Sequence, residues 1–409
     1  MKRNNKRQIW ASTGLLALGI VSIGSAPLSS QQPAPPPPPG ALGGPLVGLT
    51  QAEMNRFGAG ANEFRQPENQ QTGLGPVFNG VSCVQCHNAG APGGASNNNV
   101  GVSIVTRIGG MVNGQYSDLA NLGGPVIQAR SLREIIPTYP VPRELVPPQA
   151  NFVSRRQTTP LFGLGLIEAI PAEAILSRSN IPQGNGVMGM ANMVNNPATG
   201  QTEVGRFGWK AAVSSIHVFS SDAYLNEMGI TSQLFALENL PSGQPIPNGA
   251  DIVPDPEDEA GAEVQRLDDF QRFSAAPTPL PDTETSARGR KLFANIGCNL
   301  CHVPSFTTGV NQTAALSLKQ VNLYSDLLLH DMGPGLADGI RQGQANGNQW
   351  RTAPLWGLRF RPVYLHDGRA TTIDAAIRAH GGEAARTRNT YLLLNRTDRE
   401  NILEFLSRL

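Results

Sequence analysis

The chain has 409 residues, a formal net charge of +1, and charged residues of both signs along its length. A nucleic-acid-binding protein concentrates basic residues on one face, so this charge balance argues against nucleic acid as a partner. The 45 glycines and 33 prolines indicate long loops and modest regular structure. The length leaves room for roughly two or three domains.

The N-terminal residues have the pattern of an export signal. Four basic residues among the first seven precede an apolar stretch over residues 14–24, which is too short to span a bilayer comfortably. We predict a signal peptide over residues 1–26, followed by a proline-rich linker over 27–48. The protein is then expected to be periplasmic or otherwise exported, and it stays membrane-anchored if the signal segment is uncleaved.

Residues 49–273 are predicted to form the first globular domain. Thr50 can cap a helix at its start. A Gly-rich segment then leads to the sequence CVQCH at residues 83–87. Alternation of apolar and polar residues over 101–109 predicts a short strand, with a partner near residues 125–129.

The CVQCH sequence has a second copy, CNLCH at residues 298–302, and the two copies use all four cysteines of the chain. C-x-x-C-H is the attachment signature of c-type haem, in which two thiols bond the porphyrin and the following imidazole reaches the iron. Two disulfides or a four-thiolate zinc site are the alternatives. Neither explains why a histidine follows both cysteine pairs in a chain with six histidines. We therefore predict two covalently bound haem c groups, held by Cys83, Cys86, His87, Cys298, Cys301 and His302.

A lone carboxylate, Glu168, interrupts an apolar, Gly-rich stretch over residues 158–171. Burying an unpaired charge is costly, so this side chain needs a reason to be there. One interpretation is structural, with Glu168 paired to Arg155 or Arg156. The other is functional, with Glu168 as an acid–base group beside an open iron site.

Two further features could supply an iron ligand in the first domain. Residues 188–193 contain three methionines, and a predicted helix over 210–228 carries His217. Each has a more ordinary interpretation, because Met-rich loops usually provide flexible packing and a lone helical histidine is usually a core or surface residue.

A linker is predicted over residues 274–282, where three prolines occur within five residues. The second domain, residues 283–409, begins with a predicted helix over about 285–294 and ends with an apolar helix behind a capping box at 397–400. A helix, C-x-x-C-H and an apolar C-terminal helix are the order of parts in a cytochrome c domain. The expected fold class is therefore mainly α, with two cytochrome c-like domains and with small β elements and long loops in the N-terminal one.

The sixth iron ligand decides between functions, because a second strong ligand gives electron transfer whereas an open site admits peroxide or dioxygen. Thr371 or Thr372 can cap a predicted helix, on which Ile373, Ile377 and His380 fall on one face. Since that face must cover something in a haem domain, His380 is predicted as the distal ligand of the second haem. His330 and His366 are expected near the propionates or ligands, with His330 or Met332 as alternatives for an axial role. Natural propionate partners are Arg351, Arg359 and Arg361.

With these motifs, the sequence resembles the bacterial di-haem oxidoreductase family, which is sometimes labelled thiol oxidoreductase. That family is related to the di-haem cytochrome c peroxidases and the methylamine-utilisation maturation enzyme. The resemblance runs from about Leu49 to Leu409. Its motifs include GLGPVFNGVSCVQCH, LFGLGLIEAIP, GRFGWKA, GCNLCH, WRTAPLWGLR and YLHDGRATTIDAAIRAHGGEA.

The resemblance implies an electron-transfer haem in the C-terminal domain and a peroxidatic haem in the N-terminal domain. His380 takes the distal position that methionine occupies in the peroxidases proper, and histidine there should lower the reduction potential. Glu168 resembles the distal-pocket carboxylate of these proteins. The resemblance also implies a calcium ion held by backbone carbonyls near Arg361 and Val363.

We therefore expect an exported di-haem oxidoreductase that passes electrons from the His302/His380 haem to the His87 haem, where hydrogen peroxide is reduced. A small redox protein is the expected electron donor, and a homodimer is one state to consider. The first alternative is a pure electron-transfer cytochrome, in which His217 or a methionine from residues 188–193 closes the first iron. The second is an oxidase of an organic or protein substrate.

Overall fold

The structure is a computed structural model that describes residues 37–96 and 104–409. The predicted signal peptide and the first part of the predicted linker lie outside the described residues. Within the described part of the chain, none of the helices combines the length and the apolar character needed to cross a membrane.

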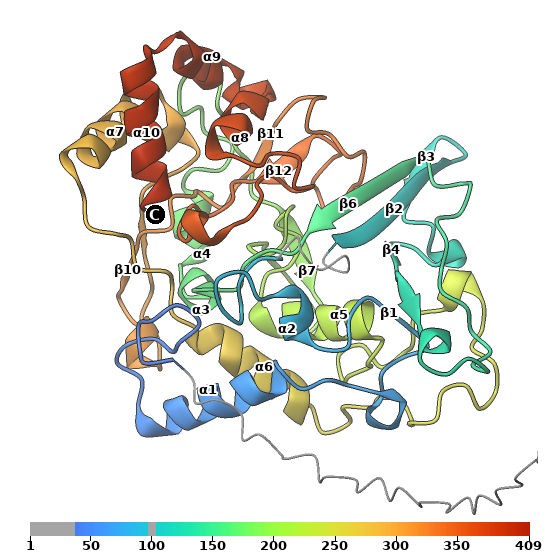
Figure 1. The fold of residues 1–409 in the computed structure, drawn as a ribbon. Coiled ribbons are helices and arrows are strands. Elements are labelled where there is room, and N and C mark those ends of the chain that lie inside the picture. The colour runs from blue at the N-terminus through green and yellow to red at the C-terminus, as the bar shows by residue number, and fades with distance from the viewer. Residues whose placement is uncertain (1–36, 97–103) are drawn as a thin grey trace, which may run out of the picture. The chain divides into compact units, whose positions relative to one another are not determined.

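The fold is mainly α, as predicted, with helices distributed along the whole described chain (Figure 1). Their bounds are α1 (Gln51–Glu63), α2 (Cys83–Cys86), α3 (Leu164–Glu168), α4 (Ala172–Leu176), α5 (Ile216–Met228), α6 (Ala262–Phe273), α7 (Glu284–Asn295), α8 (Ile373–Ala379), α9 (Ala385–Leu393) and α10 (Arg396–Ser407).

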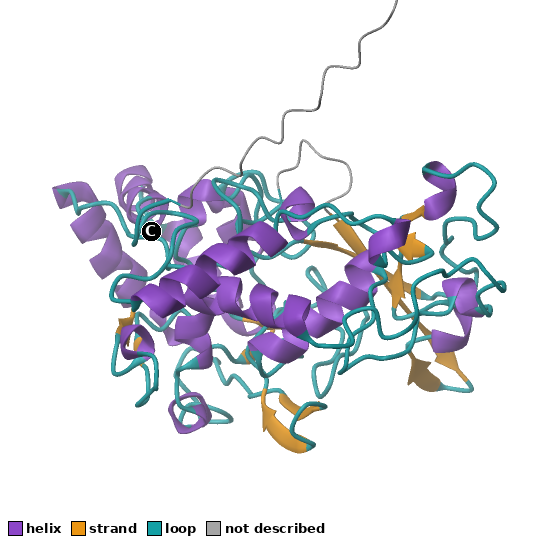
Figure 2. Ribbon diagram, turned by 90° about the horizontal axis from the view of Figure 1, so that it is seen from below, coloured by secondary structure: helices purple, strands orange, loops and turns teal. Residues whose placement is uncertain are grey.

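The strands are short, and long loops connect them to the helices (Figure 2). Their bounds are β1 (Val77–Phe78), β2 (Ile104–Val112), β3 (Gln115–Ser117), β4 (Val126–Ile127), β5 (Arg130–Ser131), β6 (Phe152–Gln157), β7 (Met193–Asn196), β8 (Gln201–Val204), β9 (Phe306–Thr307), β10 (Gln320–Val321), β11 (Leu329–Asp331) and β12 (Gln349–Arg351).

Strand β2 is the centre of the largest sheet and pairs antiparallel with β3, β4 and β6. Its pairing with β4 joins Thr106 to Ile127 and confirms the strand pair predicted from sequence. The longest pairing, from Ile104 with Gln157 to Gly109 with Phe152, was not predicted. The other strands form two-stranded antiparallel sheets, among them β1 with β5 and β11 with β12.

Two helix pairs repeat the same arrangement, with α1 packed along α6 and α7 along α10 (Figure 1). A glycine permits the close approach in each pair. A Cβ atom on Gly60 of α1 would overlap a backbone carbonyl oxygen of α6, and one on Gly289 of α7 would overlap a carbonyl oxygen of α10. Aromatic rings fill both contacts, with Phe64 4.4 Å from Phe270 and Phe293 5.5 Å from Phe405.

Helix caps explain where several of these helices begin. Thr50 and Glu53 form a capping box at α1, and Thr372 caps α8 as predicted. The capping box predicted at residues 397–400 is wrong, because α10 begins at Arg396 and is capped by Asn395. The predicted helix over 210–228 begins later than expected, at the start of α5.

The apolar core of the N-terminal half extends across the predicted linker to include Leu323, Leu327 and Trp356. A second core contains Phe293, Tyr391 and residues of α10. The predicted linker, residues 274–282, holds no helix and no strand apart from an isolated bridge at Ser274. The two C-x-x-C-H motifs therefore pack against different cores, and the shared part of the larger core packs the two halves against each other.

Candidate haem-binding sites

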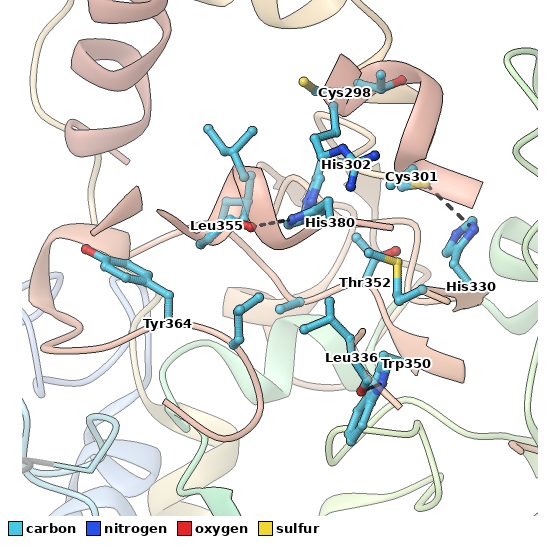
Figure 3. A pocket seen from close by; sticks show the side chains of 18 of the residues that line it. Cys298, Cys301, His302, His330, Leu336, Trp350, Thr352, Leu355, Tyr364 and His380 are labelled. Carbon is cyan, nitrogen blue, oxygen red and sulfur yellow. Dashed lines mark hydrogen bonds between the residues drawn. The ribbon is translucent and has the colours of Figure 1, made fainter. Parts of the chain in front are cut away.

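The second C-x-x-C-H motif follows directly on a helix end. Gly297, with a φ of 95°, ends α7 in the left-handed conformation and turns the chain into the motif. The motif lines a cavity together with α8, and Figure 3 shows His302 and His380 near each other inside it. Phe293 packs 6.2 Å from the His302 ring.

Backbone carbonyls orient both imidazoles of this cavity. The Nδ1 atom of His302 donates to the Tyr324 carbonyl at 2.9 Å, and Nδ1 of His380 donates to the Ala376 carbonyl at 2.7 Å. In each ring this leaves Nε2 as the metal-binding nitrogen. Burial lowers the pKa of His302 to about 4 and lowers the pKa of His380, so both rings are neutral at neutral pH, which is the ligating form.

His330 lines the same cavity, but both of its ring nitrogens are engaged. Its Nε2 lies 2.9 Å from Asp326 and its Nδ1 2.8 Å from Glu383. Burial alone would lower the His330 pKa, but hydrogen bonds to Asp326, Cys301 and Glu383 outweigh burial and raise it to about 12. His330 is therefore an imidazolium between two carboxylates, which leaves no nitrogen for an axial role.

The first C-x-x-C-H motif lines a separate cavity together with α5 and β6. Nδ1 of His87 lies 3.3 Å from the Gly94 carbonyl, and burial lowers the His87 pKa to about 4. The Phe64 ring lies 6.0 Å away, in the place that Phe293 takes beside His302. Among the described residues that line this cavity, His87 is the only histidine, and Met228 is the only methionine.

Carboxyl side chains distinguish the first cavity, since no Asp or Glu is among the described residues that line the second. Asp222 and Glu227 of α5 line it together with Arg107. Burial raises the pKa of Glu227 to about 7, although a hydrogen bond from Asn79 opposes that effect. Burial also raises the pKa of Asp222. Two carboxyl groups that hold their protons more tightly than usual therefore face the space beside His87.

The two cavities share one side chain, Trp209, which lines both. Its indole Nε1 donates to the Gln157 carbonyl at 2.7 Å. Beside it, His366 and Trp350 line the second cavity, and their rings stack at 3.8 Å. These aromatic residues connect the space around His87 with the space around His302.

A family model described as "Di-haem oxidoreductase, putative peroxidase" matches residues 149–409. The chain belongs to this family. The matched part contains the second C-x-x-C-H motif, His380 and the aromatic residues between the cavities. The first motif precedes the matched residues.

Solved structures give weaker similarities. The di-haem peroxidase BthA from Burkholderia thailandensis is 14% identical over 87% of this chain and 86% of its own, with a TM-score of 0.41. A MauG-like protein associated with microbial copper homeostasis is 16% identical over 61% of this chain and 89% of its own, with a TM-score of 0.32. Hydrazine synthase from Kuenenia stuttgartiensis is 19% identical, with a TM-score of 0.25. That match covers 36% of this chain and 55% of the hydrazine synthase chain. No curated protein matches the chain.

The two haems of a di-haem oxidoreductase fit the donor groups in both cavities. All four cysteines lie in the described part of the chain and none forms a disulfide. Because the two pairs line different cavities, a shared four-thiolate zinc site is excluded. Each cavity also holds a buried guanidinium Nε without a hydrogen-bond partner, on Arg107 in the first and Arg361 in the second. A haem propionate is the kind of group that such a nitrogen lacks.

The predicted propionate partners are only partly placed at the second cavity. Arg351 and Arg361 line it, and burial lowers the pKa of each to about 10. Arg359 does not line it; its guanidinium instead donates to the carbonyls of Leu409 at 2.7 Å and Thr278 at 2.7 Å. That interpretation of Arg359 is wrong, because the side chain holds the C-terminal residues.

Glu168 lies at the end of α3 and lines neither cavity. One carboxylate oxygen accepts from the Ile216 backbone N–H at 2.7 Å, and the other accepts from Arg272 Nε at 3.0 Å. The predicted ion pair with Arg155 or Arg156 is therefore wrong in its partner. Through these bonds Glu168 joins α3, α5 and α6. Its catalytic role stays a prediction, because its side chain lines neither haem cavity.

The other predicted ligands of the first iron also lie elsewhere. His217 is paired with Asp268 at 2.8 Å, and its side chain is 43% exposed. Met188 is exposed, and the sulfur of Met190 accepts a hydrogen bond from Gln349. None of these side chains, nor Met193, lines the cavity of His87.

Proposed function

We propose that this di-haem oxidoreductase is an exported, peroxidase-like enzyme with two unequal c-type haems. Cys298, Cys301, His302 and His380 would hold one haem, which would supply electron transfer from a small donor protein. Cys83, Cys86 and His87 would hold the other, which would supply the chemistry for reducing hydrogen peroxide. Haem iron supplies the one-electron chemistry and, where an axial position is open, the place at which peroxide binds.

The difference between the two cavities carries the proposal. The second cavity offers two neutral imidazoles whose Nδ1 atoms are both held by carbonyls. The first offers one such imidazole, that of His87, together with the carboxyl groups of Asp222 and Glu227. A bis-histidine iron transfers electrons, whereas an iron with one strong ligand can bind an oxidant.

The carboxyl groups of the first cavity are candidates for proton transfer to peroxide. Cleavage of the O–O bond needs protons, and a carboxyl with a raised pKa holds one near neutral pH. Asp222 and Glu227 have this property and line the cavity. Glu168 is the original candidate from sequence, and its ion pair with Arg272 favours the α5 carboxyl groups over it.

We also propose that each half of the chain contains a cytochrome c-like domain, within residues 49–273 and 283–409. The repeated helix pairs support this, since each brings a glycine crossing and a phenylalanine beside the haem histidine. Periplasmic location follows from the sequence pattern and from the attachment chemistry alone. Calcium near Arg361 and Val363 stays a proposal, which metal analysis of the purified protein would test.

Steady-state peroxide consumption by the purified di-haem protein tests the proposal. With a reduced small redox protein as donor, we expect two electrons to be consumed for each peroxide. If the protein passes electrons from the donor to another redox protein but does not consume peroxide, it is instead an electron-transfer cytochrome.

One observation favours that second candidate function. Met228 lines the first cavity, and a thioether can close a haem iron. Replacing Met228 with Leu separates the two functions. In a peroxidase with an open iron the substitution leaves the spin state unchanged, whereas in a wholly six-coordinate cytochrome it converts the first haem from low spin to high spin.

A further inference from the structure

Two tryptophans and a histidine lie beside the haem cavities: Trp209 lines both, and Trp350 and His366 line the second. The His366 ring stacks on Trp350 at 3.8 Å with an interplanar angle of 14°. The Trp209 ring stands edge-on to His366 at 6.4 Å. Tryptophan is more readily oxidised than histidine. Trp209 and Trp350 are therefore the two side chains of this group that can lose an electron during the reaction.

The two tryptophans differ in the charges around them. The ammonium nitrogen of Lys210 lies 4.0 Å from the centroid of the Trp350 ring, and the guanidinium carbon of Arg156 lies 5.2 Å from it. Among the described residues, no cation–π contact involves Trp209. Trp209 instead directs its Nε1 at a neutral backbone carbonyl, that of Gln157.

The two cations beside Trp350 are fixed in place. Lys210 has no exposed surface, and its ammonium donates to the carbonyls of Asn346 at 2.8 Å and Gln349 at 2.9 Å. Asp338 pairs with Arg156 at 2.6 Å and with Lys210 at 3.3 Å. One carboxylate, that of Asp338, therefore pairs with two cations, and the three side chains together keep a net positive charge.

This excess charge has opposite effects on the two oxidation states of the indole. A cation over a neutral ring is attracted to it. Once the ring has lost an electron, the same cation repels it, and in a buried site with little water this repulsion is weakly screened. The geometry thus stabilises reduced Trp350 and opposes its oxidation.

We propose that Lys210 and Arg156 protect Trp350 from oxidation, so that the electron deficit produced by peroxide is carried by Trp209. This inference rests on the proposed function. Reduction of one hydrogen peroxide to two waters takes up two electrons and two protons. For each electron, Trp209 gives one electron toward the His87 side and regains one from the His302 side, so the tryptophan ends unchanged and the donor protein supplies both electrons.

Peptide mapping of the holoprotein tests this protection. The protein is treated with hydrogen peroxide without an electron donor, digested, and analysed by mass spectrometry for oxidised tryptophan. We expect oxidation at Trp209 and at least tenfold less at Trp350. Trp356, which is buried but lines neither cavity, is the internal control and should stay unmodified. Oxidation of Trp350 equal to or above that of Trp209 in the unaltered protein would overturn the proposal.

Lys210→Met removes the charge and keeps most of the side-chain volume. In a variant that retains both haem spectra we expect Trp350 oxidation to rise about tenfold, whereas Lys210→Arg should preserve the protection. Unchanged Trp350 oxidation in Lys210→Met would contradict the role of Lys210. If Lys210→Met does not fold, the ratio of Trp209 oxidation to Trp350 oxidation, measured in the unaltered protein and in Lys210→Arg, tests the protection instead.

A second oxidant separates this inference from the proposed function. Photogenerated ruthenium(III) tris-bipyridine removes electrons without peroxide. If peroxide is not turned over but ruthenium(III) still spares Trp350 relative to Trp209, the proposed function fails while the protection stands. If peroxide is turned over and both oxidants modify Trp350 first, the protection fails alone.

Discussion

At the scale of single residues, the backbone decides which ring nitrogen of His302 and His380 is available to a haem iron. His302 donates Nδ1 to the Tyr324 carbonyl, and His380 donates Nδ1 to the Ala376 carbonyl. A neutral imidazole has only one N–H, so this bond fixes the tautomer and leaves the Nε2 lone pair available. This geometry supports our proposal that both are iron ligands.

His380→Ala should therefore convert the second haem from low spin to high spin. The reason is that the two other histidines of that cavity are engaged elsewhere: both ring nitrogens of His330 are held by carboxylates, and the His366 ring is stacked on Trp350. Electron paramagnetic resonance of the oxidised protein measures the change. His217→Ala, at a histidine that lines neither cavity, is the matched control and should leave the spectrum unaltered.

A second residue-scale prediction compares two carboxylates. Asp222→Asn should lower peroxide turnover by about a hundredfold or more with both haems retained, in keeping with the usual contribution of a general acid. Glu168→Gln should instead lower stability through its bond to Arg272 and leave turnover per haem nearly unchanged. Steady-state assays and thermal unfolding of both variants check this. Loss of turnover in Glu168→Gln alone would restore the assignment made from sequence.

At the scale of elements, a single carboxylate holds the loop that follows His380. Glu383 accepts from the Met188 N–H at 2.9 Å and the Asp331 N–H at 3.0 Å, and it pairs with His330. These contacts fasten the end of α8 to β11 and to a segment of the N-terminal half. The position of His380, the proposed distal ligand, therefore depends on contacts from both halves of the chain.

Glu383→Gln should loosen this attachment. Because His330 is 2% exposed and would keep only one carboxylate partner, we expect the free energy of unfolding to fall by about 1–3 kcal/mol. A high-spin fraction should also appear at the second haem. Denaturant titration and electron paramagnetic resonance measure the two effects. Glu400→Gln, in an exposed ion pair with Arg396, is the control and should change neither.

The helix crossing of α1 and α6 provides a second element-scale test. Gly60→Ala places a methyl group against a carbonyl oxygen of α6, and we expect a loss of about 1–3 kcal/mol in the free energy of unfolding. Gly58 lies on the same helix with open space at its Cβ position, so Gly58→Ala should stabilise the protein by about 0.5–1 kcal/mol. Equal effects of the two substitutions in urea unfolding would disprove the close crossing.

At the scale of the whole molecule, features that depend only on residues close together in the chain could be predicted from the sequence. The two C-x-x-C-H motifs, the helix leading to His380 and the caps at Thr50 and Thr372 depend on neighbours along the chain. Each needs only local geometry, so spacing and residue type were sufficient.

Contacts between distant segments could not be predicted in this way. Glu168 found its partner in Arg272, and Trp350 meets Lys210, although more than a hundred residues separate each pair. Spacing along the chain carries no information about such meetings. The sequences GRFGWKA and WRTAPLWGLR contained Trp209, Lys210 and Trp350, but only the fold showed that these residues share the space between the cavities.

The spin states of the two haems during a redox titration test the central claim most directly. We predict that the His302/His380 haem stays low spin throughout, and that the His87 haem becomes high spin in at least one redox state, in which peroxide is consumed. Two haems that remain low spin in every redox state, with no peroxide consumption, would contradict the proposed function.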